Sequence, residues 1–140
     1  MTLIDFYSGS NNKLHTACRL SAKVMQQDLK VTIYIPDNSI AEQLDNLLWT
    51  FSSTAFIPHC RVNDKLAFET PVTISQDDEP LPHDNVLINL HDGYPPFFSR
   101  FLRLIEISGT TVEDTEAART RYRFYKDRGY EIRHHKLRST

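Results

Sequence analysis

The chain has 140 residues, of which 40% are hydrophobic and 24% charged, and its formal net charge is −2. These values are typical of one globular domain with its own core, so we expect residues 1–140 to form a single domain. The two cysteines, Cys18 and Cys60, are far apart, which argues against a disulfide framework and for a reducing compartment. No apolar run is long enough to span a membrane and no signal peptide is visible, so the expected location is cytoplasmic, with no membrane partner.

The charge is distributed unevenly along the chain. Residues 1–116 contain 8 basic and 16 acidic residues, a balance of −8, whereas residues 117–140 contain 8 basic and 2 acidic residues, a balance of +6. This asymmetry indicates an acidic partner for the C-terminal region: a nucleic acid, a membrane or an acidic peptide.

The first fifty residues have the pattern strand, helix, strand, helix. We expect strands at residues 2–7 and 31–35, and helices at residues 13–27 and 40–49, from the β-branched runs and the helical spacing of apolar residues. Ser39 is the expected N-cap of the second helix, because Glu42 three residues later would complete a capping box. Alternating strands and helices predict parallel strands with helices packed on the sheet.

The second half of the chain begins less regularly. Residues 54–66 have no clear periodicity, residues 71–74 are a candidate edge strand, and residues 77–84 form an acidic, proline-containing loop. Residues 86–90 are almost continuously apolar, as a central parallel strand should be. Strands are expected at residues 102–107 and 130–134, and a helix at residues 112–128, capped by Thr110 or Thr111 and ended by Gly129. The predicted fold class is α/β: a Rossmann-like three-layer sandwich with a mostly parallel sheet and helices on both faces.

Signals for a cofactor, a metal or catalysis are weak. The first strand-to-helix turn, Ser-Gly-Ser-Asn-Asn-Lys at residues 8–13, matches neither the dinucleotide fingerprint nor the P-loop. No set of three or four His, Cys or acidic residues has metal-ligand spacing. His91 and Asp92 follow a strand, where α/β sheets bind ligands, but no nucleophile accompanies them. We therefore expect no cofactor, no metal and no catalytic residue, and a turn at His91.

Two features point to binding. Arg119, Tyr122, Arg123 and Lys126 have helical i, i+3, i+4, i+7 spacing, so they share one face of a helix. The residues expected to extend this positive region are Arg121, Arg128, Arg133, Lys136 and Arg138. The second feature is an irregular segment rich in apolar residues, which must either pack into the core or meet a partner. Its apolar residues are Trp49, Phe51, Phe56, Ile57 and Pro58.

Four segments, taken in order, resemble the chi subunit family of bacterial DNA polymerase III. They are IDFY at residues 4–7, LDNLLWTF at 44–51, AFIPH at 55–59 and ARTRYRFYKDRGY at 118–130. The resemblance covers essentially the whole chain. It implies a Rossmann-like fold that has lost nucleotide binding, and a non-catalytic accessory subunit of the clamp-loader assembly, the nucleotidyltransferase activity lying in another subunit.

The resemblance also implies two partners. One is the psi subunit, whose contact falls on the segment from Trp49 to Pro58, with Phe56 as the expected anchor. The other is the acidic C-terminal tail of single-stranded-DNA-binding protein (SSB), which ends in a phenylalanine carboxylate and connects the chain indirectly to single-stranded DNA. The tail-binding residues carried over are Arg119, Tyr122, Arg123 and Lys126; Arg123 replaces an expected lysine and Lys126 an expected arginine.

Two alternatives remain open from the residues themselves. The basic C-terminal helix could bind nucleic acid directly, although the acidic remainder of the chain argues against a large DNA footprint. A small Rossmann-type enzyme would instead use His91 and Asp92 in a cleft at the strand ends.

Overall fold

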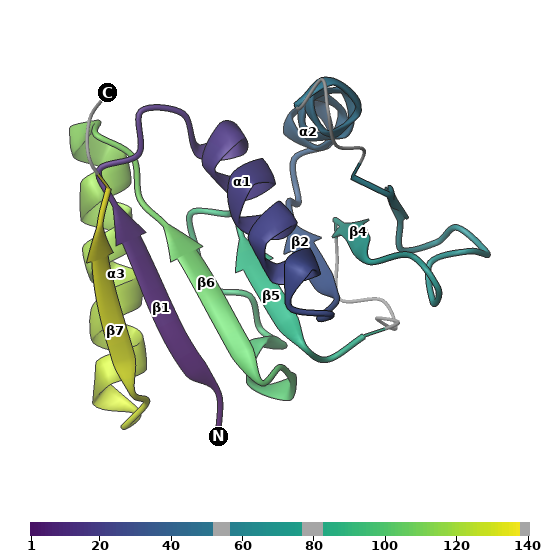
Figure 1. Ribbon diagram of the computed structural model, residues 1–140. Helices are drawn as coiled ribbons and strands as arrows, with labels where there is room; N and C mark the ends of the chain where they lie inside the picture. The colour runs from purple at the N-terminus through teal and green to yellow at the C-terminus, as the bar shows by residue number, and fades with distance from the viewer. Residues whose placement is uncertain (52–56, 77–82, 138–140) are drawn as a thin grey trace.

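A seven-stranded sheet, in which every strand pair is parallel, organises the chain (Figure 1). The computed structural model describes residues 1–51, 57–76 and 83–137. The strand order is β3-β4-β2-β5-β6-β1-β7. The strands are β1 (Leu3–Ser8), β2 (Val31–Tyr34), β3 (His59–Arg61), β4 (Val72–Ser75), β5 (Val86–Asn89), β6 (Arg103–Ile107) and β7 (Ile132–Lys136). The predicted α/β sandwich is confirmed, with a fully parallel sheet in the described residues.

Helices cover both faces of the sheet. Helices α1 (Lys13–Gln26) and α2 (Asn38–Thr50) pack on one face, and α3 (Val112–Asp127) packs on the other, behind β1 and β7 in Figure 1. A short 3-10 helix, η1 (Phe98–Arg100), adds aromatic side chains to the α3 side. The result is a three-layer arrangement in which the α3 layer lies near the β7 edge of the sheet.

Alternate strand residues build two separate cores, because neighbouring side chains of a strand point to opposite faces. Ile33, Ile88 and Ile105 belong to the core under α1 and α2. Phe6 and Leu87 belong to the core under α3, which also contains the three phenylalanines Phe97, Phe98 and Phe101. Burial on both faces explains the continuous apolar runs that predicted the central strands.

Side-chain caps fix where the helices begin. The Asn12 side chain accepts a hydrogen bond from the amide of His15, and Thr111 accepts one from the amide of Asp114. The prediction that Ser39 caps the second helix is wrong. Asp37 is the N-cap, and its carboxylate accepts from the Ile40 amide at 3.2 Å, so α2 begins two residues earlier than the capping-box pattern indicated.

The strand at residues 71–74 also differs from its prediction. Its counterpart β4 is not an edge strand, because β3 pairs with it on one side and β2 on the other. Strand β3 falls within residues 54–66, where the sequence shows no periodicity. Its three side chains are only half-buried, so the core demands no alternating pattern from them.

Candidate functional site

Helix α3 turns one face to the sheet and the other to solvent. Ala118, Arg121 and Tyr125 are its buried residues. Tyr122 is 36% exposed, and the residues Arg119, Arg123 and Lys126 are exposed on the same side. The basic face predicted from helical spacing therefore exists as a solvent-facing surface. Its binding role is taken up below as a proposal.

A buried carboxylate holds α3 in this rotation. Glu106 on β6 is 0% exposed, and both the Arg121 Nε at 2.9 Å and the Tyr125 hydroxyl at 2.5 Å donate to it. The Asn89 amide of β5 donates to the same carboxylate at 3.0 Å. Burial raises the pKa of the Glu106 carboxyl, while the Arg121 charge and the three donors oppose that effect. Burial and the neighbouring carboxylate raise the pKa of Tyr125, which keeps its hydroxyl a donor.

Arg121 does not extend the positive surface, contrary to its prediction. Its side chain is 3% exposed, and beyond Glu106 it donates to the backbone carbonyl of Asp92 at 2.6 Å. No local motif marks this burial, because a buried arginine and an exposed one look alike until the partner carboxylate is known. Its spacing to Tyr125 and Ala118 is the signal that it shares the core-facing side.

The other basic residues of the C-terminal region divide into engaged and available groups. The Arg128 guanidinium lies 3.7 Å from the Phe124 ring centre, and Arg133 is ion-paired with the buried Asp5 at 2.9 Å. By contrast, Arg119, Arg123 and Lys126 have no side-chain hydrogen bond or ion pair with any residue that the structure describes. Arg138 lies outside the described residues. These three cations are therefore available to an external anion.

A pocket of about 290 Å³ adjoins this basic face. One wall is apolar and is formed by Phe6 of β1 and by Ala118 and Tyr122 of α3; the rings of Phe6 and Tyr122 are 5.6 Å apart, edge to face. Arg119 and the β7 residue His134 also line it. No acidic residue lines this pocket within the described part of the chain. Its chemistry suits an apolar or aromatic group that carries a negative charge.

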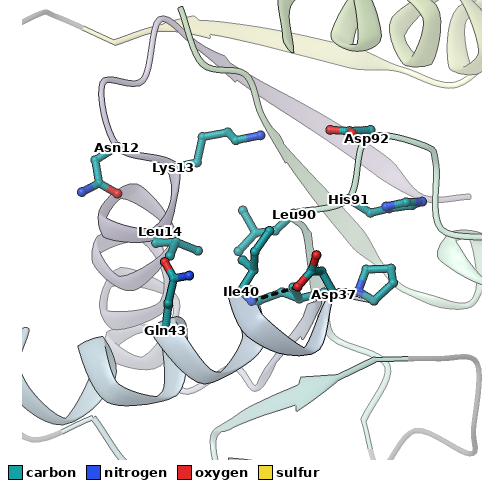
Figure 2. A pocket seen from close by; sticks show the side chains of 11 residues that line it. Asn12, Lys13, Leu14, Asp37, Ile40, Gln43, Leu90, His91 and Asp92 are labelled. Atoms are coloured by element: carbon teal, nitrogen blue, oxygen red, sulfur yellow. Dashed lines mark hydrogen bonds between the residues drawn. The ribbon is translucent and has the colours of Figure 1, made fainter. Parts of the chain in front are cut away.

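A larger crevice of about 630 Å³ lies at the carboxyl ends of β2 and β5, between the N-terminal ends of α1 and α2 (Figure 2). His91 and Asp92 line it, so a cleft does exist at the position considered for an enzyme. The structure shows no hydrogen bond between these two exposed side chains. Asn89 bonds the backbone of His91 and Gly93, and Arg121 bonds that of Asp92, so this segment forms a braced turn.

The connections of two neighbouring strands also leave to opposite faces between β1 and β6. These neighbouring strands lead into α1 and α3, which lie on opposite faces, and such positions are where doubly wound folds bind ligands. At this position two charged side chains of the protein itself pair with each other. The Lys13 Nζ lies 2.7 Å from one Asp114 carboxylate oxygen, and the Gly109 amide donates to the other. An internal ion pair thus occupies the position between the two helix N-termini.

Replacing Asp114 with asparagine should lower the free energy of unfolding by about 1 kcal/mol at pH 7, since Lys13 is partly exposed and the pair is screened. Burial alone would raise the pKa of Asp114, but the bonds from Lys13 and Gly109 outweigh it and lower the pKa below its ordinary value. A lowered pKa stabilises the fold above the unfolded-state pKa and loses that contribution as the pH falls through the folded-state value. Urea titrations should therefore separate the two proteins at pH 7 and bring them together near pH 3.

The control for this comparison is Glu116→Gln, on the exposed part of the same helix. It should leave stability unchanged to within about 0.5 kcal/mol. A stability gap between the Asp114 variant and the parent that is constant from pH 7 to pH 3 would contradict the ion-pair explanation.

The aromatic segment is divided between core and surface. Trp49 at the end of α2 is 57% exposed, and its ring lies 4.8 Å from that of His59, edge to face. Phe51 packs against the α1 side of the core, and Pro58 is half-buried. Ile57 is 2% exposed, so its side chain is a core residue. Phe56, the expected anchor for psi, lies outside the described residues.

The remaining chemical groups have structural positions. Cys18 is fully buried, and burial raises its pKa to about 12, which makes its thiol inert. In the part of the chain that the structure describes, no three His, Cys, Asp or Glu side chains are placed to hold a metal ion. None of the described helices combines the length and apolarity needed to cross a bilayer.

The fold and its surfaces define a class: a Rossmann-like α/β domain with an internal ion pair between the N-termini of α1 and α3, whose α3 helix presents cations beside a small pocket. Comparison with known proteins identifies the family. The family model of the DNA polymerase III chi subunit, HolC, matches residues 1–133, and the chain belongs to this family. The resemblance seen in the sequence is confirmed, and the chain is an accessory subunit that takes part in DNA replication.

Three curated relatives carry the name DNA polymerase III subunit chi. The protein of Pseudomonas aeruginosa is 34% identical over 141 residues, covering 98% of this chain and 98% of the relative. That of Haemophilus influenzae is 27% identical, covering 83% of this chain and 81% of the relative. That of Escherichia coli is 23% identical, with 82% and 79% covered. The similarity therefore extends over nearly the full length of the first relative and about four fifths of the other two.

Proposed function

We propose that this chain is a non-catalytic adaptor of the polymerase III clamp-loader assembly. It binds the psi subunit through one surface and the acidic C-terminal tail of SSB through helix α3. It thereby links the polymerase to SSB-coated single-stranded DNA. Membership of the chi family supports the assignment to the polymerase. The two partners are proposed from the family resemblance together with the chemistry of the surfaces described above.

The observation that carries the SSB assignment is the arrangement around Tyr122. Three cations without partners among the described residues surround a half-exposed tyrosine, next to a pocket with an apolar wall and no acidic lining. The SSB tail offers the complementary groups: aspartates, a terminal phenylalanine ring and a free carboxylate. The ring would enter the pocket, a basic side chain would clamp the carboxylate, and the outer cations would attract the aspartates.

The strength of this interaction follows from its exposure. Arg119, Arg123 and Lys126 stand in solvent, where each charge pair contributes little. The acidic balance of −8 over residues 1–116 also limits long-range attraction of an acidic ligand. We expect a dissociation constant on the order of micromolar that rises steeply with salt.

Arg123→Ala should weaken binding of a peptide ending in Asp-Phe by about 5-fold, because a charge-assisted contact at an exposed site is lost. Fluorescence polarisation with a labelled peptide from the host's own SSB measures this. The matched control is Arg128→Ala, which removes the same charge at the C-cap of the same helix. Arg128 lies over Phe124, off the basic face, so this variant should bind within about 2-fold of the parent.

The same titration distinguishes SSB-tail binding from direct binding of nucleic acid. If Arg119→Ala and Arg123→Ala both left peptide binding unchanged, the site assignment would be wrong. A labelled oligonucleotide without SSB provides the second arm. Tight, steeply salt-dependent binding of the oligonucleotide alone would favour a direct nucleic-acid-binding protein instead.

The surface proposed for psi lies at the opposite end of the sheet order, where α2 ends and β3 begins. Trp49 supports this proposal because an exposed, well-oriented aromatic side chain is a typical interface anchor. Ile57 is 2% exposed, so it supports the segment from within the core rather than by direct contact with a partner. In this arrangement the psi and SSB surfaces belong to opposite edges of one sheet, β3 and β7.

A further inference from the structure

One side of the pocket beside Tyr122 is formed by strands of the sheet rather than by helix α3. His134 lies on the edge strand β7, in register with Phe6 of β1, and its side chain is exposed at the pocket. Arg119 lines the pocket from α3. A ligand in the pocket therefore sits between a guanidinium on the helix and an imidazole on the sheet edge.

A neighbouring hydroxyl fixes the imidazole. The Ser8 Oγ and the His134 Nε2 are 2.9 Å apart. When the Ser8 hydroxyl donates to Nε2, the ring proton resides on Nδ1, and Nδ1 becomes a donor. Within residues 1–51, 57–76 and 83–137, the structure shows no hydrogen bond from Nδ1. With that tautomer, Nδ1 is a donor without an acceptor among the described residues, so a bound ligand can supply the acceptor.

The lining specifies the charge of that acceptor. The 630 Å³ crevice of Figure 2 is lined by Asp37 and Asp92, which would repel an anion. The pocket beside Tyr122 has hydroxyls, one arginine and one histidine as its polar lining, and no carboxylate among the described residues. Its apolar wall, which includes the rings of Phe6 and Tyr122, offers aromatic surface on which a further ring can pack.

We propose that His134, positioned by Ser8, binds the terminal carboxylate of the peptide ligand together with Arg119. The aromatic ring of the last residue packs on Phe6, Ala118 and Tyr122, and the carboxylate bridges α3 and β7. The pocket is thereby specific for a free C-terminus after an aromatic residue, and an internal acidic segment does not satisfy it. This inference rests on the proposed function and assigns the carboxylate contact within that same site.

The test is a cycle that pairs a change in the protein with a change in the ligand. Two peptides ending in Asp-Phe are compared, one with a free carboxylate and one with a C-terminal carboxamide, on the full chain and on His134→Ala. The substitution should weaken the free acid by about 5-fold and the carboxamide by less than about 2-fold, since only the free acid makes the charge-assisted hydrogen bond. Ser8→Ala should show the same selectivity at a smaller magnitude, because Ser8 acts through His134.

His135→Ala is the matched control. It is the next residue of β7 but faces the other side of the sheet, where it stacks on Tyr7 and bonds Asp5. It should weaken both peptides equally or not at all. Thermal denaturation of each variant checks that the edge strand stays folded.

The outcomes separate the two proposals. Failure of the parent protein to bind the free-acid peptide would overturn the proposed function and this inference with it. Binding by the parent, but an equal loss for acid and carboxamide in His134→Ala, would overturn only the carboxylate assignment. A loss confined to the free acid supports both.

Discussion

Glu106→Leu should destabilise the protein by about 3–5 kcal/mol, the largest stability effect that we expect from a single substitution. The reason is that the Arg121 guanidinium is 3% exposed and would remain buried without its carboxylate partner. The Tyr125 hydroxyl and the Asn89 amide would lose an acceptor at the same time. Urea denaturation at pH 7 measures the change.

A double substitution tests the cause. Glu106→Leu combined with Arg121→Met removes both charges and fills the space with apolar side chains, so it should be more stable than Glu106→Leu alone. If the double variant were as unstable as the single one or worse, an unpaired guanidinium would not be the source of the loss. Glu113→Leu, at an exposed position in the first turn of α3, controls for replacing any acid by leucine.

Trp49→Ala should weaken association with psi by about 30-fold, the largest binding effect that we expect. Its ring is 57% exposed and held edge to face against His59. The His59 Nε2 lies 2.9 Å from an Asp45 carboxylate oxygen, so the surface under the indole is braced before a partner arrives. Isothermal titration of psi into the purified chain gives the affinity.

Leu102→Ala is the control, because Leu102 is also a large exposed apolar residue at 68% but precedes β6, which three strands separate from β3. It should leave psi binding within about 2-fold of the parent. The Trp49 variant should also bind the SSB peptide normally, since α3 packs on the other face of the sheet. Loss of both ligands together would show that the two surfaces are not independent.

Much of the architecture could be predicted from local pattern. Residues 86–90 had to be a central strand because their apolar run suits burial on both faces, and β5 lies between β2 and β6. The ends predicted for α3 are confirmed: of the two expected caps, Thr110 and Thr111, it is Thr111 that accepts from the Asp114 amide, and Gly129 follows the C-cap with φ +83°. Such signals succeed because each depends on only a few neighbouring residues.

The predictions failed where a choice depended on distant residues. Asp37 and Ser39 are both good N-caps by composition, and the structure uses Asp37. Strand β3 has little apolar pattern because it is a short edge strand, so only its pairing with β4 reveals it. The burial of Arg121 depends on its partner, Glu106, which lies on strand β6, fifteen residues earlier in the chain.

The sequence by itself determined the parallel α/β fold and the face of α3 that carries Arg119, Tyr122, Arg123 and Lys126. Both follow from periodicity, which is a property of the local backbone. Only the tertiary structure decided which cations are available and what lies beside them. Arg121 is paired with the buried Glu106 and is therefore not available. His134 and Phe6 come from strands β7 and β1 and complete the pocket beside α3. The physical reason is that burial and pairing of charges depend on the partners that folding brings together, and spacing along one helix does not encode them.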